Sequence, residues 1–114
     1  MKRIAVPVSG NLLSEHFGQC EAYRIFVIGE DEVSSERVEI PPQMEVSMLP
    51  GWASALGITD IIAYRVDKSI IALFTPFRIN LFVGIPRETP EKLIDDYLNG
   101  RLKSDERIIS EIIK

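Results

Sequence analysis

The chain has 114 residues, 46% of them hydrophobic, and its 13 basic and 17 acidic side chains give a net charge of −4. This size and composition suit one compact domain with its own core, and no stretch gathers Lys or Arg with aromatic residues as a nucleic-acid surface would. Because the apolar runs are short and a lone cysteine fits a reducing compartment, we predict a cytoplasmic protein that binds neither membrane nor nucleic acid.

The first forty residues predict three strands. The β-branched run at 3–8 ends in a Ser-Gly-Asn turn, as expected for a buried strand. Residues 22–29 and 33–40 form two further runs around a charged tip, which indicates a hairpin. Proline cannot donate to a β-ladder, so the paired prolines at 41–42 end the third strand and leave 43–47 as a loop.

The middle of the chain predicts a helix, a strand and a second helix. Pro50 suits the first turn of a short helix that carries Trp52 against the sheet, and Gly57 closes this helix in left-handed geometry. Residues 58–66 then indicate a fourth strand. Asp67 is expected to cap the next helix, whose length a proline at position 76 limits.

The last third predicts a strand and two helices. Residues 79–85 indicate a fifth strand. Thr89 and Pro90 supply an N-cap and a first-turn proline, and Gly100 stops the helix that follows. Ser104 is a candidate cap for a further short helix with an isoleucine stripe, for which folding back on its own domain is favoured over an exposed patch.

Three strands followed by an alternation of helices and strands predict an α/β fold with a mixed sheet and helices on its faces. Ligands in such sheets gather beyond the carboxyl ends of the parallel strands. The turns at 9–18 and 64–67 would meet there.

The turn after the first strand holds the only histidine and the only cysteine, in the sequence His16-Phe17-Gly18-Gln19-Cys20. An imidazole and a thiolate are candidate ligands for zinc, copper or an iron–sulfur centre, but a closed site needs about four ligands. Any metal at His16 and Cys20 would therefore be shared, exposed or externally supplied. The alternative interpretation is structural, with Phe17 in the core, Gly18 in the turn, Cys20 as a small buried group and His16 solvated.

These residues carry a resemblance. The segments IAVPV, LSEHFGQCEAY, LPGW, VGIP and YLNGRL resemble the dinitrogenase iron–molybdenum cofactor biosynthesis family, in order, over residues 2–102. The resemblance implies a ribonuclease-H-like motif with a five-stranded mixed sheet in the order 3-2-1-4-5 and helices on both faces. It also implies a family domain at 1–103, followed by a C-terminal helical extension at 104–114.

The chain departs from the family at three places. Close relatives end the fourth strand in a Gly-Gly-Met-Gly turn whose amides can approach a cluster, whereas this chain has Tyr64, Arg65, Val66 and Asp67. Met44 stands where relatives carry a histidine, and the tail at 104–114 lacks their Cys and His residues. Arg65 could replace the lost amides as an anion clamp, or could pair with Asp67 or solvent.

The resemblance implies a non-catalytic accessory protein that binds or carries an iron–molybdenum or other metal–sulfur cluster. Its partners would be a cluster donor or acceptor, such as an iron–sulfur carrier ATPase, and a homodimer would double the ligands. The alternative is a divergent member that has lost its cofactor and acts as a protein-interaction module. We expect no enzyme, because the first strand has no carboxylate for two-metal chemistry. The cofactor-binding candidates are Ser9, Gly10, His16, Gly18, Tyr64 and Arg65, and the metal candidates are His16 and Cys20.

Overall fold

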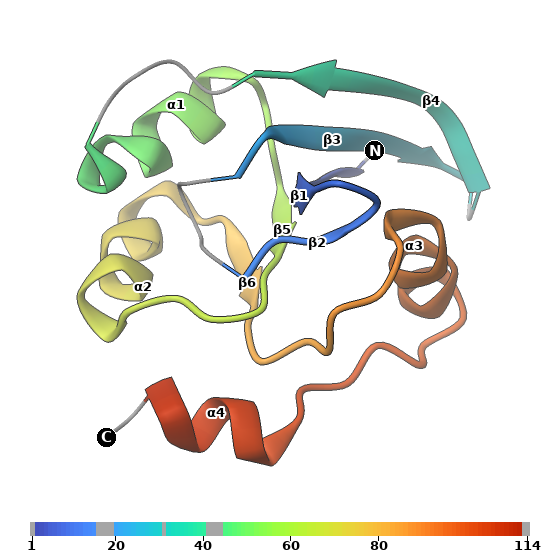
Figure 1. Cartoon of the computed structure of the whole chain (residues 1–114). Coiled ribbons are helices and arrows are strands. Elements are labelled where there is room, and N and C mark those ends of the chain that lie inside the picture. Colours follow the sequence, from blue (N-terminus) through green and yellow to red (C-terminus); the bar gives the residue numbers. More distant parts are fainter. Residues whose placement is uncertain (1, 16–19, 31, 41–44, 113–114) are drawn as a thin grey trace.

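The computed structural model describes residues 2–15, 20–30, 32–40 and 45–112. Its centre is a mixed sheet in the order β4-β3-β1-β5-β6, with the short β2 paired to β1 (Figure 1). β1 is antiparallel to β3 and parallel to β5, which is parallel to β6. The strands are β1 Lys2–Ser9, β2 Leu12–Leu13, β3 Ala22–Gly29, β4 Glu32–Glu39, β5 Asp60–Ile62 and β6 Asn80–Phe82.

The five expected strands lie in the expected order, but the expected number is wrong because β2 adds a sixth. β2 forms where the chain turns back after β1, with Val8 opposite Leu13. Gly10 has a φ of 67° at this turn, a left-handed value that glycine adopts without strain. The predicted turn at 9–18 therefore begins as a small hairpin.

β5 and β6 are shorter than the predicted strands at 58–66 and 79–85. Beyond them the two segments stay paired by isolated bonds, since the Ala63 amide donates to the Phe82 carbonyl at 2.7 Å and the Gly84 amide to the Tyr64 carbonyl at 2.9 Å. Gly84 has a φ of 75°, which breaks the extended backbone. The regular ladder thus ends at Ile62 and Phe82, before Gly84.

The local helix signals are mostly confirmed. Asp67 accepts from the Ser69 amide at 3.0 Å, and Thr89 accepts from the Lys92 amide at 3.3 Å. The helices are α1 Leu49–Ala55, α2 Lys68–Phe74, α3 Pro90–Leu98 and α4 Glu106–Ile112, with 3₁₀ turns at Val46–Met48 and Thr75–Phe77. The loop predicted at 43–47 is thus partly wrong, because Val46–Met48 leads into α1, while residues 43–44 lie outside the described residues.

The predicted cap of the last helix is wrong. Asp105, not Ser104, caps α4, because an Asp105 carboxylate oxygen accepts from the Arg107 amide at 2.8 Å. The Ser104 hydroxyl instead donates to the Val83 carbonyl at 2.6 Å. The Ser104 side chain therefore holds the C-terminal segment against the residues that follow β6 and does not cap α4.

The sheet is covered on both faces, as expected. We call the layer between the sheet and α3 the α3-side core, and its buried members are Ile4, Val6, Val8, Leu13, Phe26, Ile28, Ile62, Ile85, Leu93 and Ile94. The α1–α2-side core lies on the other face, with Ala5, Tyr23, Ile25, Leu49, Ala53, Ile58, Ile61, Phe74 and Ile79. Alternate residues of β1 and β5 serve the two cores, as the period of two requires.

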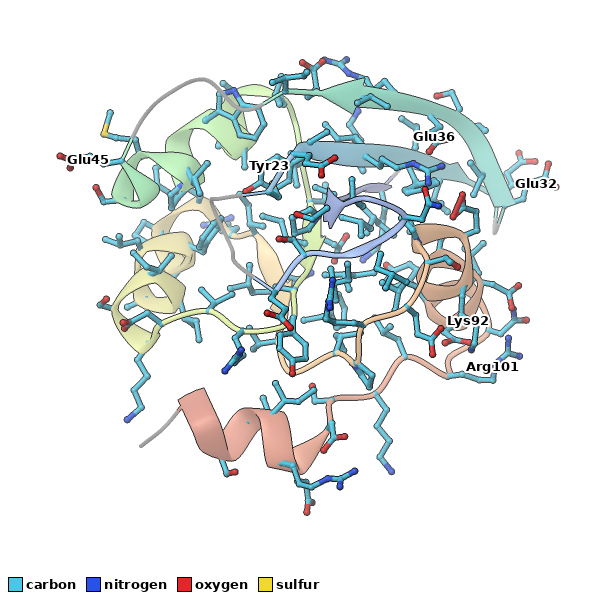
Figure 2. All side chains as sticks on the ribbon, viewed as in Figure 1. Tyr23, Glu32, Glu36, Glu45, Lys92 and Arg101 are labelled. Carbon is cyan, nitrogen blue, oxygen red and sulfur yellow. The ribbon has the colours of Figure 1, made fainter. Side chains whose placement is uncertain are left out.

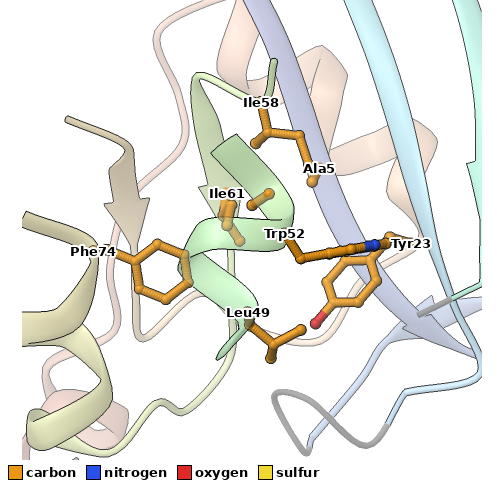
Figure 3. Close-up of a pocket in the computed structure, with 8 residues that line it drawn as sticks. Ala5, Tyr23, Leu49, Trp52, Ile58, Ile61 and Phe74 are labelled. Atoms are coloured by element: carbon orange, nitrogen blue, oxygen red, sulfur yellow. The ribbon is translucent and has the colours of Figure 1, made fainter. Parts of the chain in front are cut away.

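Trp52 packs on the sheet, as predicted. Its ring centroid lies 5.2 Å from that of Tyr23, and the two rings are tilted by 55°. Figure 3 shows these rings lining an apolar crevice with Leu49, Ile61 and Phe74. The crevice has no room for a water molecule, so it is core packing and not a ligand cavity.

Ion pairs join the elements at the surface. Arg24 of β3 pairs with Glu36 of β4 and reaches Glu91 of α3 at 2.8 Å. Lys92 of α3 and Arg101 of the segment after it lie near each other (Figure 2), and both contact the Asp96 carboxylate, at 2.9 and 3.2 Å. These exposed pairs link β4 and the segment after α3 to the body of the domain.

Asp60 is fully buried at the amino end of β5. Its carboxylate accepts from the Thr59 hydroxyl at 2.7 Å and from the side-chain amide of Asn80 at 3.0 Å, and the Lys2 ammonium of β1 lies 3.8 Å away. The first strand thus places a lysine beside this aspartate.

Candidate functional site at the carboxyl edge of the sheet

The turn after β1 is organised by two serines. The half-buried Ser9 donates from its hydroxyl to the Ser14 hydroxyl at 3.1 Å. Ser14 is buried, and its amide donates to the Pro7 carbonyl at 2.9 Å. Ser9 and Gly10 are therefore part of a tight hairpin that directs the chain towards His16 and Gly18, which lie outside the described residues and stay predictions.

Arg87 fixes the next part of this loop, and the sequence reasoning missed it. Its Nε donates to the Leu13 carbonyl at 2.8 Å, and its Nη1 lies 3.5 Å from the Glu15 carboxylate. The Leu13 amide in turn donates to the Glu88 carbonyl at 3.0 Å. The segment after β6 thus clamps the start of the histidine-containing turn. Its only sequence signal is an arginine directly after the VGIP segment.

Tyr64 and Arg65 occupy the turn after β5. Tyr64 is half-buried against the α3-side core, and the Arg65 guanidinium lies over its ring, 5.1 Å from the centroid. Asp67 caps α2, and the amide and hydroxyl of Ser69 lower the pKa of its carboxyl group. Residues 83–88 bridge the two predicted turns, because they bond both to Tyr64 and to Leu13.

Cys20 lies elsewhere. It is half-buried and packs against the α1–α2-side core, on the opposite face of the sheet from Tyr64. Burial raises the pKa of the Cys20 thiol, and the neighbouring Tyr23 side chain offsets part of this rise. A metal would have to displace the thiol proton at neutral pH. The structure therefore does not bring Cys20 together with Tyr64 and Arg65.

A shallow groove of about 400 Å³ lies beside Tyr64, between the segment after β6 and α4. Its walls are formed by Tyr64, Pro86, Arg87, Asp105, Arg107 and Ile108. Among the described residues no group of three or more His, Cys, Asp or Glu side chains could hold a metal ion. The groove holds the guanidinium groups of Arg87 and Arg107 and one carboxylate, that of Asp105, so its hydrogen-bond donors are guanidinium N–H groups, which bind anions.

The described helices include none that is both long and apolar enough to cross a membrane. A family model described as dinitrogenase iron-molybdenum cofactor matches residues 1–100. The uncharacterized protein MJ0580 of Methanocaldococcus jannaschii is 25% identical over 111 residues, which cover 93% of each chain.

Two solved structures have a similar fold. The crystal structure of PH0822 has a TM-score of 0.86 at 23% identity, covering 93% of this chain and 96% of that one. The apo form of the orange protein from Desulfovibrio gigas has a TM-score of 0.75 at 13% identity, covering 92% of this chain and 93% of that one. At these identities the likeness concerns the fold.

Proposed function

Since the chain belongs to the dinitrogenase iron–molybdenum cofactor family, we propose that it is a non-catalytic accessory protein that binds or carries an iron–molybdenum or other metal–sulfur cluster. The family match over residues 1–100, which includes the His16-Phe17-Gly18 turn, is the observation that carries this proposal. The sheet order supports the further inference that the domain has the ribonuclease-H-like motif.

The chemistry of the carboxyl edge suits reversible binding. Metal–sulfur clusters are usually anionic, and their sulfides accept hydrogen bonds. Arg65 and Arg87 supply guanidinium groups at this edge, while His16 is the proposed direct ligand. A single imidazole ligand, helped by charged hydrogen-bond donors, would leave most of a cluster free for transfer. Cys20 fits such a site poorly, because its thiol packs against the α1–α2-side core.

The second candidate is a member that has lost its cofactor and acts as an interaction module. The environment of Cys20 favours it, as does the filling of the family's glycine turn by Tyr64 and Arg65. Under the first proposal the partners are a cluster donor or acceptor, such as an iron–sulfur carrier ATPase, and a homodimer could complete the ligand set. Under the second candidate function, the partner is a protein that brings no cluster.

Anaerobic reconstitution tests the proposal. The purified chain is incubated with iron, sulfide and molybdate, desalted, and measured for bound metal and visible absorbance. We expect stoichiometric metal that His16→Ala abolishes and that Cys20→Ala retains, because only the former removes a proposed ligand. Wild-type protein without metal would overturn the cluster proposal and leave the interaction module. Loss in Cys20→Ala alone would overturn the assignment of His16 as the ligand.

A further inference from the structure

The C-terminal segment from Ser104 to Ile112 lies outside the stretch that matches the family model, yet it is docked on the domain by specific contacts. The Ser104 hydroxyl donates to the Val83 carbonyl at 2.6 Å, and the Asp105 amide donates to the Gly84 carbonyl at 2.7 Å. Ile108 is 9% exposed. In Figure 1, α4 lies beyond the ends of β5 and β6, alongside the chain that leaves β6.

Gly84 makes this docking possible. Its φ of 75° is left-handed, and a Cβ placed there would lie 2.6 Å from Cδ1 of Ile109. Real Cβ atoms do not approach carbon so closely, so a larger residue at position 84 would force the Ile109 side chain of α4 to shift. The absence of a side chain at Gly84 therefore lets Ile109 of α4 pack closely against the segment after β6.

Docking of α4 places a second arginine on the groove beside Tyr64. Arg87 lies on the wall formed by the segment after β6, and Arg107 lies on the wall formed by α4. Within the described residues the Arg107 guanidinium meets one partner, the Asp105 carboxylate, at 3.6 Å. That carboxylate also caps α4 through the Arg107 amide. The Arg107 side chain is 92% exposed and has donors to offer a ligand.

We propose that the C-terminal segment is part of the binding site, and that Arg107 and Arg87 together bind a small, multiply charged anion in the groove between α4 and the segment after β6. Guanidinium groups bind oxyanions through paired N–H donors, and the sulfurs of metal–sulfur species also accept hydrogen bonds. The inference rests on the proposed function for the identity of the anion, a metal–sulfur species, and extends its site to residues 104–112.

Titration with sodium molybdate, followed by amide NMR, tests the site without a cluster. We expect saturable shifts at Gly84, Arg87 and Arg107, and about tenfold weaker binding in Arg107→Ala, since a charge-assisted contact is lost. Lys103→Ala is the matched control, because it removes the same charge from an exposed residue on the neighbouring groove. Equal weakening in both variants, or no saturable shift in the wild type, would overturn the site.

Two further measurements separate this inference from the proposed function. Sodium phosphate is titrated in parallel, and tighter molybdate binding supports a site for the metal-bearing anion, whereas equal affinity overturns that part of the inference. Reconstituted cluster retained by Arg107→Ala as by the wild type would overturn the role of Arg107 and leave the proposed function standing. The protein could also bind molybdate in a manner that depends on Arg107 and yet never retain a cluster. This result would support the anion site and overturn the cluster proposal.

Discussion

Arg87→Ala should loosen the turn that carries His16 without unfolding the domain. The variant loses the 2.8 Å bond from Nε to the Leu13 carbonyl and the 3.5 Å contact with Glu15. A hydrogen bond from a charged donor contributes about 1.5–3 kcal/mol, and the exposed ion pair adds little. Because the Arg87 side chain is 34% exposed, we take the low end, about 1.5 kcal/mol, for the local opening.

Amide hydrogen exchange measures this opening directly. A cost of about 1.5 kcal/mol corresponds to roughly tenfold faster exchange. We expect this at the Leu13 amide, which bonds to Glu88, but not at the Ala63 amide, which bonds to Phe82. Arg87→Lys keeps the charge without the Nε donor and should exchange at an intermediate rate. Unchanged exchange at Leu13, or an equal rise at Ala63, would refute a local clamp.

Three other changes test the cores and the electrostatics. Phe74→Ala should lower the free energy of unfolding, measured in urea, by about 3–5 kcal/mol, because Phe74 is 1% exposed. The control Phe77→Ala should lower it by about 1 kcal/mol or less, because Phe77 is exposed. Equal losses would contradict the described packing. Alkylation of Cys20 should become rapid only at a pH above the ordinary thiol pKa, because burial raises the pKa of Cys20. Tyr23→Phe should move the pH midpoint of alkylation higher, since the Tyr23 side chain offsets part of the rise. A midpoint below the ordinary thiol pKa would contradict the raised pKa. Arg24 lowers the pKa of Glu91, so their pairing stabilises the fold above the unfolded value of 4.5 and is lost as pH falls through the folded pKa. In Arg24→Gln the melting temperature should therefore fall less steeply as the pH is lowered. A pH dependence of the melting temperature equal to that of the wild type would show that the Arg24–Glu91 pair makes no such contribution.

Local signals in the sequence were sufficient for most helices. Thr89 with Pro90 and Asp67 act within one helical turn, so their capping follows from neighbouring residues alone. The alternation of elements predicted a mixed sheet, and the family resemblance implied the order of its strands. The close approach of Gly84 to Ile109 could not be predicted in this way, because it joins a left-handed glycine to a side chain from the far end of the chain.

The candidate site was only partly predictable for the same reason. Tyr64 lies at the expected edge, but Arg87 could not be linked to Leu13 without the tertiary structure. Cys20 was grouped with His16 by its spacing, and this grouping stays a prediction, because the structure shows only that the Cys20 thiol packs against the α1–α2-side core. Sequence distance within a turn does not fix the direction of a side chain. His16 itself stays a prediction.

The bond from Arg87 to Leu13 joins residues 74 positions apart, which has a consequence for the chain as it leaves the ribosome. At about 5–20 residues per second, the segment that carries His16 emerges roughly 4–15 seconds before its anchor, for a separation of 74 residues. The β1–β3 and β3–β4 pairings need only the first forty residues and can form during that interval. The anchor of this turn therefore forms only after Arg87 has emerged, later than the β1–β3 and β3–β4 pairings.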